Sequence, residues 1–188
     1  MNAITLLKDD HRTIKQLFRR YRNLGDRAYL QRRRLVAEMR EELSRHASIE
    51  ETVFYPAIRA ALPDATDDVL ESLEEHHIVK WTLDELEKMD PREERYNAKV
   101  TVLMENVKHH IGEEESELFP EVRRGMGRRE LDALGVQLKA AKGIAPTRPH
   151  PRAPDEPPGN IVATLVAAPL DAAIGRAKQT ARRVTRRG

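Results

Sequence analysis

Apolar residues recur along most of the chain at steps of three and four. In the first segment these positions are Ile4, Leu7, Ile14, Phe18 and Tyr21. An amphipathic helix has this period, because about 3.6 residues complete one turn. Similar stripes run through residues 29–61, 69–86 and 100–118. Four long helices joined by short links predict an all-α protein, an up-down-up-down four-helix bundle.

Breaks in the pattern predict the boundaries of these helices. Residues 23–26 and 63–68 are turn-forming, and Asp90-Pro91 predicts the start of the fourth helix, with Asp at the cap and Pro at the first position. A short fifth helix is expected at residues 130–141. Residues 146–158 contain six prolines and predict an extended linker that does not pack. The expected division is therefore a bundle at 1–145, a proline-rich linker at 146–159 and a basic helical tail at 160–188.

Polar residues interrupt the apolar stripes at positions that should face the core. A buried ionisable group is costly unless it is paired or bound to a metal, so six such interruptions need a cause. The six are His11, His46, Glu50, His76, His110 and Glu114.

The chain also repeats itself. Residues 46–56 and 110–120 both fit the pattern H-x-x-x-E-E-x-x-F/L-Y/F-P, at an offset of 64. The first and third helices match at an offset of 65, which aligns His11 with His76 and Lys15 with Lys80. These near-constant offsets indicate that a two-helix hairpin was duplicated. The duplication predicts two equivalent sets of polar side chains at the centre of the bundle.

Each hairpin supplies one His from its first helix and a His-x-x-x-Glu from its second. Residues four apart lie on the same helical face, so His46 with Glu50, and His110 with Glu114, can reach one centre. Four imidazoles and two carboxylates exceed the needs of one tetrahedral zinc, and they suit two bridged metal ions. The absence of cysteine excludes thiolate ligands. Nitrogen and oxygen donors favour iron or manganese and do not exclude zinc.

This motif set resembles the hemerythrin-like (HHE cation-binding) family over about residues 3–125. The resemblance implies a non-haem di-iron centre with an oxo or hydroxo bridge inside a four-helix bundle. It implies that Glu50 and Glu114 bridge the two ions. The full ligand set that it implies is His11, His46, Glu50, His76, His110 and Glu114.

The chain departs from the oxygen-carrying members of that family. Those proteins have a second His one turn after the third-helix His, where this chain has Lys80 counted from His76. Their fourth-helix carboxylate is Asp at the fifth position after the His, whereas here Glu114 stands at the fourth. The missing nitrogen donor predicts an additional open coordination position.

Several assignments stay open from the sequence. His77 and Glu115 adjoin His76 and Glu114, and Glu51 and Glu115 either orient imidazoles or lie at the surface. Tyr21, Tyr55 or a water molecule is a candidate for the remaining coordination position.

The open position favours redox chemistry on hydrogen peroxide, a catalase-like disproportionation that serves oxidative-stress defence. The alternatives are binding or sensing of O2 or NO, and iron homeostasis or iron sensing.

The net charge of +2 is uneven, because residues 147–188 carry eight Lys or Arg and three Asp or Glu. This distribution does not predict a nucleic-acid-binding fold. It leaves contact of the basic tail with a partner or an anionic membrane surface as a possibility. No apolar run approaches the roughly 20 residues of a membrane-spanning helix. The opening residues also do not form a secretion signal, so a cytoplasmic protein is expected.

Overall fold

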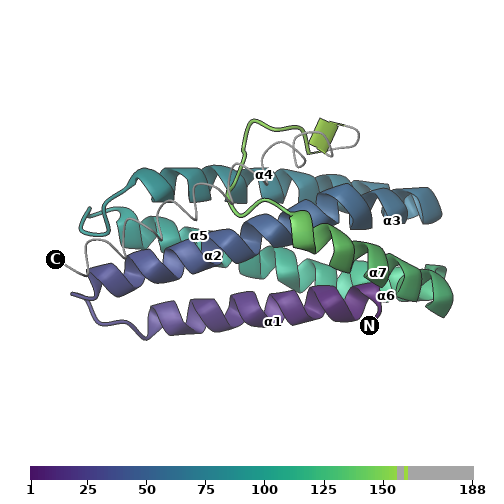
Figure 1. Ribbon diagram of the computed structural model, residues 1–188, viewed down its shortest axis with the longest axis horizontal. Helices are drawn as coiled ribbons and strands as arrows, with labels where there is room; N and C mark the ends of the chain where they lie inside the picture. The colour runs from purple at the N-terminus through teal and green to yellow at the C-terminus, as the bar shows by residue number, and fades with distance from the viewer. Residues whose placement is uncertain (156–158, 161–188) are drawn as a thin grey trace.

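The computed structural model describes residues 1–155 and 159–160 of the chain, and their regular structure is helical throughout. Four long antiparallel rods form an up-down-up-down bundle, and a further helix lies along one side (Figure 1). The helices are α1 (Ala3–Arg22), α2 (Tyr29–Ile49), α3 (Tyr55–Ala61), α4 (Thr66–Lys88), α5 (Tyr96–Glu113), α6 (Phe119–Gly125) and α7 (Arg128–Ile144). The predicted fold is therefore confirmed. The fifth helix, α7, is longer than the predicted 130–141.

The two predicted hairpins are the strongest helix pairs in the bundle. Helix α1 packs against α2 and, to a similar extent, against α7, whereas α4 packs chiefly against α5. Helix α7 lies against α1, α2 and the turn that follows α2. Its Gly135 lies so close to the first residues of the chain that a Cβ there would stand 2.4 Å from the carbonyl oxygen of Met1.

Apolar side chains form two separate cores, one toward each end of the bundle. One core joins Leu7 and Ile49 to Leu138 of α7, and the other is built around residues such as Ile14 and Val107. The six polar residues predicted to face inward lie between these cores. His11, for example, stands between Leu7 and Ile14 on α1. The bundle therefore holds a polar layer between two apolar ones.

A π-helical turn follows α2 at Glu50–Phe54, and a second follows α5 at Glu114–Leu118. In the first, the amide of Tyr55 donates to the carbonyl of Glu50, five residues earlier. Pro56 and Pro120 each stand two positions after the last residue of these turns. A proline has no N–H and its ring clashes with the carbonyl four residues earlier. One wider turn removes that conflict, so each rod continues past its proline instead of ending there.

The structure corrects the predicted start of the fourth long helix. Helix α5 begins at Tyr96 rather than at Asp90-Pro91. The Asp90 carboxylate accepts from the amide of Arg92, and the amide of Asp90 donates to the side chain of Glu93. Asp90 therefore closes a turn before the helix instead of capping it.

The proline-rich segment is packed, so the expectation of an unpacked linker is wrong for its described part. Arg148 pairs with Glu87 at 2.7 Å, and the guanidinium of Arg152 lies over the ring of Trp81. Asn160 is buried and donates to the backbone carbonyl of Glu51 at 2.9 Å. These polar anchors hold the prolines against the bundle. The division of the chain at 145/146 stays a prediction, and the predicted tail lies outside the described residues beyond Asn160.

No helix among the described residues has both the length and the apolarity that a bilayer crossing needs.

The contact at Gly135 gives a test of how α7 docks. Gly135→Ala places a methyl group against the backbone of Met1 and Ala3, so we expect it to destabilise the protein by about 1–3 kcal/mol. Gly143→Ala in the same helix meets nothing within 4 Å and should stabilise it by up to about 1 kcal/mol, because Ala favours helix. Urea unfolding of both variants measures the difference. Equal effects would contradict the close approach of α7.

Candidate metal centre

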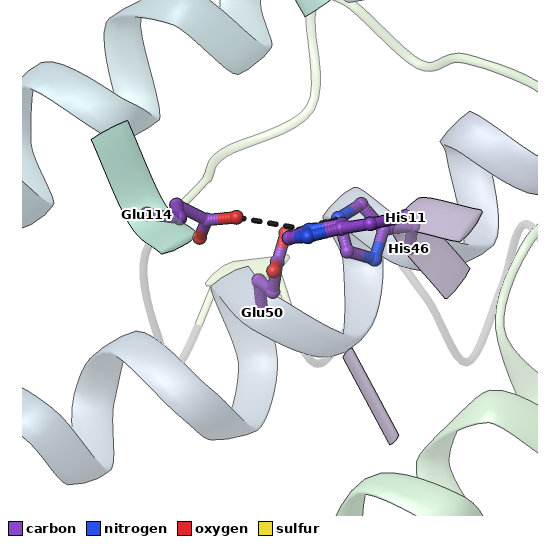
Figure 2. Close-up of side chains that lie close together, drawn as sticks. All are labelled: His11, His46, Glu50 and Glu114. Carbon is purple, nitrogen blue, oxygen red and sulfur yellow. Dashed lines mark hydrogen bonds and ion pairs between the residues drawn. The ribbon is translucent and has the colours of Figure 1, made fainter. Parts of the chain in front are cut away.

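All six residues predicted to form the site lie in the polar layer, and none has more than 4% of its surface exposed. Figure 2 shows four of them, His11 from α1, His46 from α2, Glu50 from the first π turn and Glu114 from the second, with their side chains converging. His76 from α4 and His110 from α5 complete the layer.

The four imidazoles form two pairs through their Nε2 atoms. His11 and His46 approach to 3.2 Å, and His76 and His110 to 3.1 Å. Each pair comes from one of the duplicated hairpins. The duplication therefore places two equivalent pairs of nitrogen donors side by side in the buried layer.

The two carboxylates lie between these pairs. Glu50 Oε2 is 3.3 Å from His46 Nε2 and 3.4 Å from His76 Nε2. Glu114 Oε2 is 3.1 Å from His11 Nε2 and 3.6 Å from His110 Nε2. Each carboxylate therefore contacts one imidazole of each pair.

The donor set fits metal ions. The ligand atoms of His11, His46, Glu50 and Glu114 lie within 4.8 Å of one another, as do those of Glu50, His76 and His110. Both carboxylate oxygens of Glu50 and Oε2 of Glu114 are buried without a hydrogen bond among the described residues. Such oxygens are costly unless a cation binds them. Imidazole and carboxylate donors of this kind suit iron, manganese or zinc.

The outer nitrogen of each imidazole faces a carboxylate. Metal-binding histidines commonly have such a partner, which fixes the ring and its tautomer. The four pairs, by Nδ1–O distance, are His11 with Glu115 (2.9 Å), His76 with Glu51 (3.0 Å), His110 with Glu75 (2.8 Å) and His46 with Asp10 (3.7 Å).

Lysines neutralise three of these outer carboxylates. Lys15 pairs with Glu115 at 3.0 Å, Lys80 with Glu51 at 2.7 Å, and Lys142 of α7 with Asp10. Of the two glutamates whose roles the sequence leaves open, Glu51 is buried and Glu115 is half-buried, and each contacts an imidazole.

Sequence reasoning missed Asp10 and Glu75 as partners of His46 and His110. The signal was present in the repeat, because the two residues occupy matching positions directly before His11 and His76.

The neighbouring candidates point away from the layer. His77 accepts a hydrogen bond from the indole N–H of Trp81 at 2.8 Å, on the outer side of α4. Glu115 is bonded to His11 and Lys15 rather than facing the centre. The structure thus brings His76 and Glu114 together with the other candidates, and it leaves His77 and Glu115 outside.

The two halves of the layer differ at one aromatic position. Tyr55 donates its hydroxyl hydrogen to Glu114 Oε1 at 3.0 Å, whereas its counterpart in the repeat, Phe119, stacks on the His11 ring at 5.7 Å. Burial raises the pKa of Tyr55 well above its ordinary value, so it keeps its proton. Tyr21 packs in the other apolar core, donates to the exposed Asn97 and does not reach the layer. Of the two tyrosines, only Tyr55 adjoins the centre.

Burial and mutual repulsion control the charges of the layer. Burial raises the pKa of Glu50 well above its ordinary value, and the nearby Glu114 carboxylate raises it further. Burial also acts to raise the pKa of Glu114, but His110 and His11 outweigh it, and the pKa of Glu114 lies below its ordinary value. Burial lowers the pKa of His46 to about 4. Without a metal ion, the layer therefore favours a protonated Glu50 beside an ionised Glu114.

Several known proteins are similar to this chain. The sequence profile of the hemerythrin HHE cation-binding domain matches residues 2–122. An uncharacterised hemerythrin-like protein of Schizosaccharomyces pombe is 30% identical over 163 residues, which cover 86% of this chain and 79% of that protein. A DNA nickase of Nostoc is 26% identical over 142 residues, which cover 76% of this chain but only 39% of the nickase. The crystal structure of a hemerythrin HHE cation-binding domain-containing protein from Mycobacterium kansasii matches with a TM-score of 0.66 and 28% identity, covering 76% of this chain and 86% of that one.

The raised pKa of Glu50 gives a prediction for the metal-free protein. A carboxyl group with a raised folded pKa contributes most to stability below its ordinary pKa of 4.5, and that contribution is lost as the pH rises through the folded pKa. Gln has the shape of the protonated acid and never ionises. Glu50→Gln should therefore stabilise the metal-free protein at pH 8 by about 1–3 kcal/mol, and the gain should shrink toward pH 4.5.

Urea unfolding in the presence of a chelator, at a series of pH values, measures this gain. Glu105→Gln, which removes an exposed carboxylate on α5, is the matched control and should show no comparable pH dependence. A Glu50→Gln variant less stable than the parent at pH 8 would contradict the assigned charge state.

Proposed function

This chain belongs to the hemerythrin HHE cation-binding family, and from that premise we propose that its polar layer holds two iron ions and disproportionates hydrogen peroxide. In this proposal His11 and His46 bind one ion, and His76 and His110 bind the other. Glu50 and Glu114 bridge them. One peroxide gives up two electrons and two protons and becomes O2, and a second peroxide takes them up and becomes two water molecules.

The contacts of the two carboxylates carry the two-ion part of this proposal. Glu50 and Glu114 each reach one imidazole of each pair, which is the position of a group shared between two ions. A single ion would need the six donors to converge on one point. They form two overlapping groups instead. This arrangement favours two ions bridged by carboxylates.

The donor count supports reaction with a small oxygen-containing molecule. Lys80, one turn after His76, supplies no imidazole, and its ammonium group pairs with Glu51 instead. Two imidazoles and two shared carboxylates would not fill the coordination of either ion, so the site could also take up water, peroxide or O2. Bound iron would supply the capacity to accept two electrons from one peroxide and return them to the next.

A cavity of about 260 Å³ beside the layer supports the access of such a molecule. It is lined by Glu51, Tyr55, Pro56, Arg59, Val69, Leu73 and Asp155. The hydroxyl of Tyr55 connects this cavity to Glu114, and the side chains of Val69 and Leu73 keep part of the wall apolar. Tyr55 fixes the orientation of Glu114 while keeping its own proton. Glu51 and Glu115 hold the rings of His76 and His11 in place.

Metal content and oxygen release test the proposal on the same sample. The iron-loaded protein should contain two irons per chain and release one O2 for every two peroxides consumed. His76→Ala should lower the rate at least about tenfold, because removing a ligand that is held by its own carboxylate partner disrupts the centre. His77→Ala, which alters the adjacent residue on the outer side of α4, should leave both metal content and rate unchanged.

Failure of the iron-loaded protein to release O2 from peroxide would overturn the catalase-like activity. A reversible absorption change with O2 or NO, without turnover, would indicate gas binding or sensing instead. Unfolding of the protein when iron is removed would indicate a role in iron homeostasis or iron sensing, because metal binding is then coupled to folding.

A further inference from the structure

The second hairpin has an acidic cleft that its duplicate lacks. Among the described residues, a cleft between α4 and the turn after α5 is lined by Asp68, Glu71, Ser72, Glu113, Glu114, Glu117 and Leu118. No basic side chain lines it. Asp68, Glu71 and Glu117 are exposed, and Glu113 is half-buried. The innermost carboxylate is Glu114, which is 1% exposed and whose Oε2 has no hydrogen-bond donor in the described part of the chain.

The repeat provides an internal comparison for this cleft. At the offsets of 65 and 64, Asp68, Glu71, Glu113 and Glu117 correspond to Ala3, Leu6, Ile49 and Val53. These four apolar residues belong to the core that α7 completes, or pack against it. Helix α7 lies over this side of the first hairpin and closes it (Figure 1). The same structural position is therefore apolar and covered in one half, and acidic and open in the other.

A second group of side chains of the kinds that bind metal ions lies beside the cleft. Ligand atoms of Glu75, His109 and Glu113 lie within 4.8 Å of one another. His109 Nε2 is 3.1 Å from Glu113 Oε1 and 3.9 Å from Glu75 Oε1. Glu113 also lines the cleft, and Glu75 contacts the buried His110 through its other oxygen at 2.8 Å. This outer cluster therefore adjoins both the solvent and the buried layer.

We propose that the acidic cleft is the route by which divalent metal ions reach the buried layer, and that Glu75, His109 and Glu113 bind the incoming ion first. The cleft concentrates cations near its mouth, because several carboxylates of one sign line it. The outer cluster offers one imidazole and two carboxylates, a donor set suited to a hydrated divalent ion of the first transition series. The exposure of the outer cluster suits transient binding of the incoming ion. The ion then moves inward along Glu113 and Glu114.

The inference rests on the proposed metal centre and concerns the rate at which that centre fills, not its final content.

Fe²⁺ is added anaerobically to the metal-free full chain, and unbound Fe²⁺ is captured by a colorimetric chelator at successive times. Glu71→Gln combined with Glu117→Gln should slow uptake about tenfold at low ionic strength. The difference should shrink as salt is added, because salt screens exposed charges. The final iron content should equal that of the parent protein.

Two matched controls isolate the cleft. Glu41→Gln combined with Glu105→Gln removes the same charge from exposed positions elsewhere on the bundle and should leave the rate within twofold of the parent. His109→Asn should slow uptake severalfold, whereas His77→Asn should not, because His77 pairs with Trp81 away from the cluster. Thermal unfolding verifies that each variant retains the stability of the parent.

The outcomes separate the two proposals. A parent protein that never takes up two irons overturns the metal centre and, with it, the route. A parent that fills normally, with cleft and His109 variants that fill at the rate of their controls, overturns the route alone. Slow filling confined to the cleft and His109 variants, with unchanged final content, supports both.

Discussion

The structure depends on enclosing six ionisable side chains in the middle of a helical bundle. Carboxylates and imidazoles lose their hydration there, and they are tolerated only if other groups replace it. The bundle supplies these groups as further side chains around the six. Each imidazole has a carboxylate on its outer side, and lysines neutralise three of those carboxylates. The inner oxygens of Glu50 and Glu114 have no such replacement. A cation bound at the centre would supply the positive charge that these oxygens need.

The repeat of one short hairpin accounts for the extent of the polar layer, and the two copies differ at a few positions around it. Both copies keep the His pair, the carboxylate, the outer partners and the proline after the π turn. They differ at Tyr55 and Phe119, and they differ in what covers them. Helix α7 closes the first hairpin, while the proline-rich segment, anchored by Asn160, lies beside Glu51. The metal-donor residues are thus repeated symmetrically, but the segments that cover them are not. This gives the first copy a polar hydroxyl, that of Tyr55, and the second copy an open acidic cleft.

The sequence by itself determined the fold class, the duplication and the identity of the inward-facing polar residues. These follow from periodicity, because a residue on the apolar stripe of a helix must face the core whatever its neighbours are. His76 is one of these residues, and the structure places it inside. The repeat also contained the outer partners Asp10 and Glu75. Their pairing with His46 and His110, on different helices, could not be read from one helix alone.

Only the tertiary structure decided which side chains meet across helices. The position of Glu50 and Glu114 between the two imidazole pairs depends on the register of separate rods. So do the hydrogen bond from Tyr55 to Glu114 and the distance of Tyr21 from the layer. The start of α5 at Tyr96 and the docking of the proline-rich segment were also invisible to local rules. For α5, the deciding interaction is a turn closed by the side chain of Asp90. For the proline-rich segment, the deciding interactions are the individual contacts of Arg148, Arg152 and Asn160. Helical periodicity specifies which face of a helix is buried, whereas packing specifies its partner, and chemistry at a shared centre depends on the partner.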